Sequence, residues 1–270
     1  FIVGENGFVA ETADGGDTWT WDQLGTATLR DIFMVNGQVG FIAGDNQTIW
    51  RTTDGGQSFG RMQMPSTISE QEEDYLGIYA FSENEAWALG HRRGTIVHLN
   101  GDQWEYIGWT GYTYTGLALP APNEGWAIAD TGHIYHFNGQ WSQAPTIRAG
   151  GPLRTIQMYS TTEGWAAGDG GVVVRYTNGR WTESRIPRPF YRGGITGLHV
   201  LAPDHVWAAA SLDIGPQAEG AIFRYRGSGW EEVAHTPLGP LNAIWMDDDL
   251  TAGWAVGNDG LVMRYAVPQP

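Results

Sequence analysis

The sequence predicts an all-β protein, folded as a seven-bladed β-propeller of four-stranded antiparallel blades. Three observations support this fold class: the composition, a short motif that recurs at intervals of roughly 40 residues, and hairpin signals inside each interval. The 270 residues include 39 Gly, 14 Trp, 11 Tyr and 9 Phe. Aromatic residues favour strands, and few segments show the apolar period of an amphipathic helix, so the composition indicates an all-β fold.

An apolar tetrapeptide marks each repeat of the chain. Its seven copies are FIVG, FIAG, WALG, WAIA, WAAG, WAAA and WAVG, which begin at Phe1, Phe41, Trp87, Trp126, Trp165, Trp207 and Trp254. A repeat of this length that holds four short strands is typical of a propeller blade. We therefore expect a single propeller domain over residues 1–270, with repeat units at 1–23, 29–62, 75–107, 115–144, 154–184, 196–233 and 242–265.

Turn signals divide each complete unit into four strands. In the unit around Trp126 we expect an inner strand near Leu117, a second strand at 126–129, a tight turn at 130–132, a third strand at 134–137, an Asn138-Gly139 turn and a fourth strand led by Trp141. Such turns need positive φ at their central residues, which Asn, Asp and Gly tolerate.

The two terminal units are incomplete in a complementary way. Residues 1–23 hold strands two to four of a unit, and residues 242–265 hold strands one to three. A ring whose last blade takes a strand from the opposite terminus leaves no exposed edge. We expect seven blades, with the fastening strand in a segment that precedes Phe1. A six-bladed ring in which the two terminal units merge is the alternative.

Charge and composition exclude several classes of function. The net charge is −15 and the sequence pI is about 4.7, which disfavours nucleic acid and anionic membrane surfaces as partners. The absence of Cys excludes disulfides and thiolate metal sites. No apolar run approaches the roughly 18 residues of a membrane span. Because Phe1 starts the sequence inside a strand, we expect that an N-terminal segment, such as a signal peptide or lipid anchor, has been removed.

Two octets, TADGGDTW at 12–19 and TTDGGQSF at 52–59, share one pattern of Thr, Asp, Gly, hydroxyl and aromatic residues. The Asp can accept backbone N–H bonds across a turn between strands three and four, the Gly permits positive φ, and the aromatic packs between sheets. Later units keep the turn and the aromatic but lose the Asp, so we interpret the octet as a fold element. Its structural residues are Thr12, Asp14, Gly16, Trp19, Thr52, Asp54, Gly56 and Phe59.

The octets resemble the Asp box of bacterial-neuraminidase-type (BNR) repeats. Together with GWAVG-type strands, they look similar to the propellers of the photosystem II stability and assembly factor family and to related bacterial surface propellers. The resemblance covers nearly the whole chain at the level of the repeat. It implies a binding or assembly module in an extracytoplasmic space, namely the periplasm, the thylakoid lumen or the cell surface, with an arginine-rich partner face.

The sequence does not contain a recognisable catalytic constellation. Sialidases share the Asp box and carry an Arg-Ile-Pro motif, but here RIP lies at 185–187, well after the first box. Other glycosidases need two carboxylates about 5–10 Å apart, and we interpret the acidic runs at 70–74 and 247–249 as solvated surface. We expect no catalytic residue, cofactor or metal. A glycan-binding or sialidase-like glycoside-hydrolase propeller is the alternative function.

A column of basic side chains recurs at one register of the third strand. It comprises Arg51, His98, His136, Arg175, Arg224 and Arg264. We interpret these residues as interblade contacts or as stems that lie over the sheet.

The variable loops indicate where a partner binds. In a propeller, the loops from strand four to the next strand one lie on the same face as the turns between strands two and three, and function is normally placed on such loops. Arg and aromatic residues gather there, which is a composition typical of interface cores. The predicted partner-binding residues are Arg92, Arg93, Trp109, Tyr112, Arg148, Arg154, Arg185, Arg188, Phe190, Tyr191 and Arg192. We predict a non-catalytic protein-binding propeller that acts as an assembly factor or accessory subunit of a larger membrane-bound complex, photosynthetic or on the cell surface.

Overall fold

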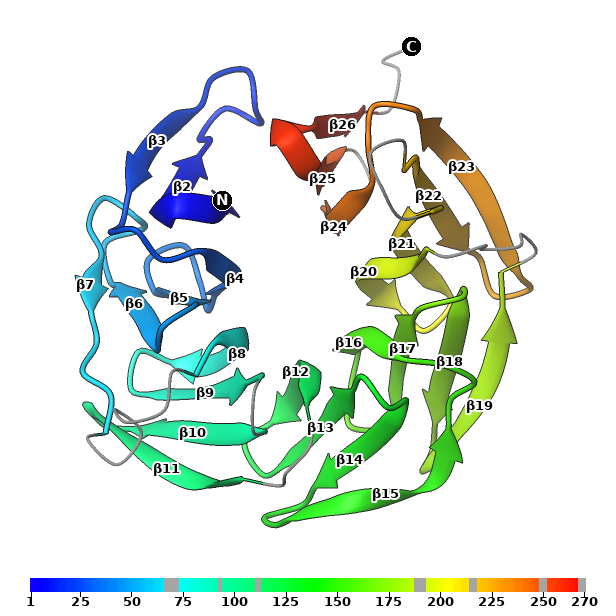
Figure 1. The fold of residues 1–270 in the computed structure, drawn as a ribbon, viewed down its shortest axis with the longest axis horizontal. Coiled ribbons are helices and arrows are strands. Elements are labelled where there is room, and N and C mark those ends of the chain that lie inside the picture. The colour runs from blue at the N-terminus through cyan, green and yellow to red at the C-terminus, as the bar shows by residue number, and fades with distance from the viewer. Residues whose placement is uncertain are drawn as a thin grey trace. The chain divides into compact units, whose positions relative to one another are not determined.

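The chain forms seven antiparallel sheets and almost no helix. The computed structural model describes residues 1–65, 73–91, 94–109, 113–186, 193–213, 218–247 and 252–266. Over these residues there are strands β1 to β26, most of which are labelled in Figure 1, and two short 3₁₀ helices, η1 (Glu5–Gly7) and η2 (Asn258–Gly260). The first and last sheets are separate three-stranded sheets and the other five have four strands. The fold is therefore the predicted seven-bladed β-propeller, and the six-bladed alternative is wrong.

The residues fall into two compact units, Phe1–Leu117 and Ala118–Pro270, which are described separately. The first unit holds blades 1 to 3. Their strands are β1 (Ile2–Val3), β2 (Phe8–Glu11) and β3 (Thr20–Gln23); β4 (Leu29–Met34), β5 (Gly40–Gly44), β6 (Thr48–Thr52) and β7 (Gly60–Arg61); and β8 (Tyr75–Ser82), β9 (Glu85–Gly90), β10 (Thr95–Asn100) and β11 (Gln103–Trp109).

The second unit holds blades 4 to 7, of which the first strand, β12 (Tyr114–Ala121), begins just before the boundary. The remaining strands of blades 4 and 5 are β13 (Glu124–Ala129), β14 (His133–Phe137), β15 (Trp141–Arg148), β16 (Leu153–Met158), β17 (Glu163–Gly168), β18 (Val172–Thr177) and β19 (Arg180–Arg185). Blades 6 and 7 comprise β20 (Gly194–Ala202), β21 (His205–Ser211), β22 (Gly220–Tyr225), β23 (Trp230–Thr236), β24 (Leu241–Met246), β25 (Ala252–Gly257) and β26 (Val262–Ala266).

The recurring tetrapeptide forms the second strand of each blade, and this strand is buried in blades 2 to 6 but only partly buried in blades 1 and 7. In β9, β13 and β17 the last five residues are all buried, which is typical of a strand covered on both faces. The apolar clusters of each unit lie between neighbouring sheets, for example between blades 2 and 3 and between blades 5 and 6. The core is thus distributed between the blades, and the second strand supplies side chains to both of its faces.

Close backbone packing explains why the tetrapeptide often ends in glycine. A Cβ at Gly168 would lie 2.0 Å from the carbonyl oxygen of Pro152, and one at Gly257 would lie 2.3 Å from that of Pro240. At both places the chain enters the first strand of the same blade, and the amide of Asp169 donates a 2.9 Å hydrogen bond to Pro152 O. A side chain at these positions would push the first strand away from the second.

Five of the six basic side chains in the third-strand column lie over the tryptophan of the second strand. The guanidinium carbons of Arg175, Arg224 and Arg264 lie 5.2–5.4 Å from the ring centroids of Trp165, Trp207 and Trp254. His98 and His136 stack on Trp87 and Trp126 at centroid distances of 4.0 and 4.9 Å. Each of these pairs is directly opposite across two strands of one sheet. These five side chains lie as stems over their own sheet, and cation–π attraction adds to the packing of the arginines. Arg51 instead makes the expected interblade contact, since its Nη1 donates to Glu83 O at 3.1 Å and to Asp102 Oδ1 at 3.4 Å in blade 3.

Candidate protein-binding edge

Each blade has two edges, which the strand register defines. In blade 5 the pairs Leu153↔Gly168 and Val172↔Arg185 bring the start of strand one, the turn between strands two and three, and the end of strand four to one edge. We call this the loop edge. The opposite edge carries the turns between strands three and four, and we call it the box edge because both Asp boxes lie there.

Four of the sequence-predicted partner residues lie at the loop edge. Trp109, Arg148 and Arg185 are the last residues of β11, β15 and β19, and Arg154 is the second residue of β16. The other seven, Arg92, Arg93, Tyr112, Arg188, Phe190, Tyr191 and Arg192, lie outside the described residues. The assignment of these eleven residues to a partner therefore stays a prediction.

Arg154 makes a bidentate ion pair with Asp169. Its Nε and Nη2 donate to Oδ1 and Oδ2 of the carboxylate at 2.9 and 2.7 Å, and this hydrogen bonding raises the pKa of Arg154. The pair joins the start of strand one to the residue that follows strand two. Its guanidinium thus has a structural role in holding the loop edge of blade 5, which the sequence interpretation did not anticipate.

The same clamp recurs in other blades. In blade 2, Arg30 donates to both carboxylate oxygens of Asp45 at 2.7 and 2.8 Å. The side chain of Asp45 is more buried than that of Arg30. In blade 7, Asn242 Nδ2 donates to Asn258 Oδ1 at 2.8 Å at the same two positions. The sequence interpretation missed Arg30. A usable signal was present, since Leu-Arg is followed fifteen residues later by the Asp of Ala-Gly-Asp in both clamped blades.

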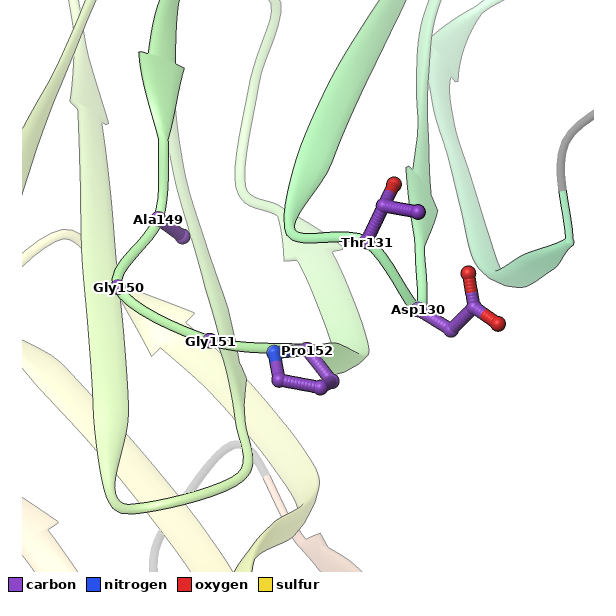
Figure 2. Close-up of a pocket in the computed structure, with 6 residues that line it drawn as sticks. All are labelled: Asp130, Thr131, Ala149, Gly150, Gly151 and Pro152. Atoms are coloured by element: carbon purple, nitrogen blue, oxygen red, sulfur yellow. The ribbon is translucent and has the colours of Figure 1, made fainter.

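A pocket of about 370 Å³ opens at the loop edge between blades 4 and 5. Figure 2 shows its two walls, the turn Asp130–Thr131 after β13 and the segment Ala149–Pro152 that leads from β15 to β16. The amide of Ala149 donates to Gly132 O at 3.2 Å, which ties the two walls together. The pocket therefore has a fixed backbone frame at the edge where partner binding is predicted.

The acidic runs are less solvated than the sequence interpretation assumed. Glu73 is only 1% exposed and accepts a 2.8 Å hydrogen bond from Thr95 Oγ1. Asp74 Oδ1 accepts from the amide of Asn46 at 3.1 Å, and Asp247 Oδ2 accepts from the amide of Ala252 at 2.9 Å. The interpretation as solvated surface is therefore wrong for Glu73, whereas Asp74 and Asp247 are half-buried and each accepts a bond from the backbone of a neighbouring segment. The rest of the two runs, 70–72 and 248–249, lies outside the described residues.

The two Asp boxes have matching hydrogen bonds. Asp14 accepts from the amide of Thr18 at 2.9 Å and from its hydroxyl at 2.5 Å, while Thr12 Oγ1 accepts from the amide of Gly16 at 2.7 Å. The second box repeats this network with Thr52, Asp54, Gly56 and Ser58. Gly16 and Gly56 have φ values of 85° and 94°. Bonding to the hydroxyl and amide of the residue four positions on lowers the pKa of Asp14 and Asp54 to about 2.

The aromatic residues of the boxes differ in their surroundings. Phe59 packs against the cluster of Val9, Leu24, Leu29 and Ile42 between blades 1 and 2, and its ring meets that of Phe1 edge-on at 6.5 Å. Trp19 in the first box is partly buried. The second box therefore contributes to packing between sheets as well as to its own turn.

Among the described residues, no group of three or more His, Asp or Glu side chains is placed to hold a metal ion. A search of the same residues for a long apolar helix that could cross a membrane found none.

Two assembly factors resemble the sequence. The chloroplastic photosystem II stability/assembly factor HCF136 of Arabidopsis thaliana is 25% identical over 305 aligned positions, which cover 98% of this chain and 72% of that protein. The photosystem II assembly lipoprotein Ycf48 of Synechococcus sp. (strain CC9902) is 32% identical over 111 positions, which cover 39% of this chain and 32% of that protein. No family model matches the sequence.

Solved propellers share the fold. A solved structure of YCF48 bound to D1 peptide has a TM-score of 0.74 and 21% identity, and the match covers 98% of this chain and 87% of that one. A structure of catalytically inactive virginiamycin B lyase from Staphylococcus aureus with quinupristin has a TM-score of 0.73 and 17% identity. This match covers 97% of this chain and 88% of that one. The fold thus also carries enzymes, but the relatives found by sequence are named assembly factors. The chain is a propeller that resembles photosystem II assembly factors.

Proposed function

We propose that this protein is a non-catalytic assembly factor or accessory subunit that binds a protein segment of a larger membrane-bound complex. The observation that carries the proposal is the resemblance to photosystem II assembly factors, which in HCF136 extends over 98% of this chain. A photosynthetic complex is accordingly the first client to test. We also propose that residues 1–270 act as one propeller domain in an extracytoplasmic compartment.

The loop edges suit such a role physically. In blades 2 and 5 an Arg–Asp clamp ties the start of the first strand to the end of the second, so the adjoining loops start from a rigid frame. Binding residues on loops that a rigid scaffold positions are a common arrangement. YCF48, which shares the fold, has been solved with a bound D1 peptide, and this supports a protein segment as the ligand class here.

A pull-down from the detergent-solubilised membrane fraction of the source organism tests the proposal. The tagged wild-type chain should copurify with the subunits of one membrane complex, identified by mass spectrometry. Reversing two predicted loop charges, Arg188→Glu with Arg192→Glu, should reduce recovery of that complex at least fivefold, since charge reversal adds repulsion to the loss of favourable contacts.

A matched control reverses two charges at the box edge. Arg180 begins β19 and Arg226 follows β22, both exposed at the edge opposite the loops. Arg180→Glu with Arg226→Glu changes the net charge by the same amount and should leave recovery unchanged. Equal recovery with both double variants would contradict the proposed edge, and a wild-type chain that captures no membrane complex but binds a glycan array would contradict the proposed function.

A further inference from the structure

The ion pair between Arg154 and Asp169 lies next to a contact between two blades. Asp169 follows β17 of blade 5, and its backbone forms an isolated antiparallel bridge with Gly194, the first residue of β20 in blade 6. The next amide, that of Gly170, donates to Gly193 O at 2.9 Å. The carboxylate that Arg154 holds is therefore carried by the same stretch of backbone that pairs with the entry into blade 6.

Two glycines make this contact a close one. A Cβ at Gly194 would lie 2.6 Å from Asp169 Cα, and a Cβ at Gly193 would lie 1.9 Å from Ser211 O. The entry segment thus lies in backbone contact with the turn of blade 5 on one side and with the end of β21 on the other. Because no side chain separates these backbones, a shift of Asp169 is passed on to the two glycines.

Three hydrogen bonds fix Asp169 itself. Its carboxylate accepts two bonds from Arg154, and its amide donates to Pro152 O at 2.9 Å. The side chains of the ion pair are 45% and 36% exposed, and a pair this exposed adds little to global stability. The bidentate geometry, however, fixes the orientation of both groups. The clamp is therefore better suited to positioning the turn than to stabilising the whole fold.

Blade 2 repeats this arrangement toward blade 3. Arg30 holds the carboxylate of Asp45 in the same bidentate way. Two residues further on, the amide of Gln47 donates to Glu73 O at 2.8 Å, just before the chain enters β8. In both clamped blades, the turn that the clamp holds is thus bonded to the entry into the following blade.

We propose that the Arg154–Asp169 clamp positions the chain where it enters blade 6, at the end of the loop that precedes Gly193, and that Arg154 is a positioning residue for client binding and not a contact of the client. That loop holds four of the predicted partner residues, all outside the described residues: Arg188, Phe190, Tyr191 and Arg192. The inference rests on the proposed function, which supplies the client. It gives Arg154 a different role from the sequence prediction, which places it among the partner contacts.

Hydrogen exchange tests the coupling between the blades without any client. In Asp169→Ala, the NMR-detected protection factor of the Gly170 amide should fall about two- to fivefold, the range expected for an exposed ion pair, because its acceptor Gly193 O is placed less firmly. Glu231→Ala is the matched control, since it also removes a carboxylate held by an arginine, Arg224, but near the box edge of blade 6. Unchanged protection of Gly170 in Asp169→Ala would overturn the proposal.

Recovery of the membrane complex, quantified by mass spectrometry, tests the role in binding. Asp169→Ala should reduce it about two- to fivefold, and Glu231→Ala should leave it unchanged. The exchanged pair, Arg154→Asp with Asp169→Arg, should restore both the protection of Gly170 and the recovery of the complex, although it reverses the charge at the predicted contact. Protection restored without recovery of the complex would overturn the proposal, because the guanidinium of Arg154 would then itself bind the client.

The two measurements separate this inference from the proposed function. Full recovery of the complex by Asp169→Ala would overturn the positioning role and leave the assembly function standing. A wild-type chain that captures no membrane complex would contradict the proposed function, while the protection of Gly170 still decides whether the clamp couples blades 5 and 6.

Discussion

At the scale of single residues, Asp14 and Asp54 show how a local hydrogen-bond network makes a turn dependent on charge. Each carboxylate accepts from the amide and the hydroxyl four residues on, and each pKa is lowered to about 2 from an ordinary value of 3.8. In the unfolded chain these bonds are absent. The ionised carboxylates therefore stabilise the fold above about pH 4, and this contribution is lost as the pH falls towards 2.

Replacing both box carboxylates should flatten this acid dependence. Asp14→Asn with Asp54→Asn should lower the melting temperature at pH 6, and the difference from wild type should shrink between pH 4 and pH 2 because the wild-type carboxylates protonate there. Melting followed by circular dichroism from pH 6 to 2 measures both curves. Asp259→Asn is the control, since that carboxylate makes no hydrogen bond within the described chain. A pH-independent difference would contradict the assigned bonds.

At the scale of elements, the described part of blade 7 has three strands, whereas blades 2 to 6 have four. In blades 5 and 6 the third-strand tyrosines Tyr176 and Tyr225 are 9% and 8% exposed. Each packs on a Trp near the start of the fourth strand, Trp181 or Trp230, with ring centroids 5.1 and 5.5 Å apart. The corresponding Tyr265 of β26 is 37% exposed, and the described residues form no fourth strand beside it. The tyrosine of β26 is therefore less buried than the corresponding tyrosines of β18 and β22.

This difference should appear in hydrogen exchange. Amides of β24 to β26 in the 270-residue chain should exchange faster than those of β16 to β19, because a strand with fewer buried neighbours opens at a lower free-energy cost. Mass-spectrometric exchange with peptide-level resolution can compare the two blades in one experiment. Equal protection in both blades would contradict the prediction that the three described strands of blade 7 open more easily than the four of blade 5.

At the scale of the whole molecule, charge limits the partners of the protein. The chain has 30 acidic and 15 basic side chains, and every basic one is Arg. Some of these arginines are already engaged within blades, by an Asp clamp at Arg154 or over a Trp at Arg175. Non-specific attraction to an anionic surface is therefore weak, and recognition has to come from local sites.

The protein should not bind anionic surfaces by charge alone. In about 0.15 M salt, the purified chain should neither sediment with phosphatidylserine vesicles nor shift a DNA duplex, because the net charge of −15 repels both. Vesicle co-sedimentation and gel shift provide the measurements. Binding that weakens steeply with added salt would show that a basic patch dominates over the total charge.

The sequence by itself determined the fold class, the seven repeats and the position of most strands, because these follow from short, periodic signals. The strand expected at 126–129 is the end of β13, and the turns expected at 130–132 and 138–139 follow β13 and β14. Only the tertiary structure revealed contacts between residues separated along the chain. The clamp between Arg154 and Asp169, the burial of Glu73 against Thr95, and a pocket with walls from two separate loops depend on strand register and on packing between blades. The clamp left a trace in the sequence, the Leu-Arg and Ala-Gly-Asp spacing that blades 2 and 5 share, but its pairing became evident only once the strand register was known. The other two features left no comparable spacing, since their residues belong to segments that only the packing of the blades brings together.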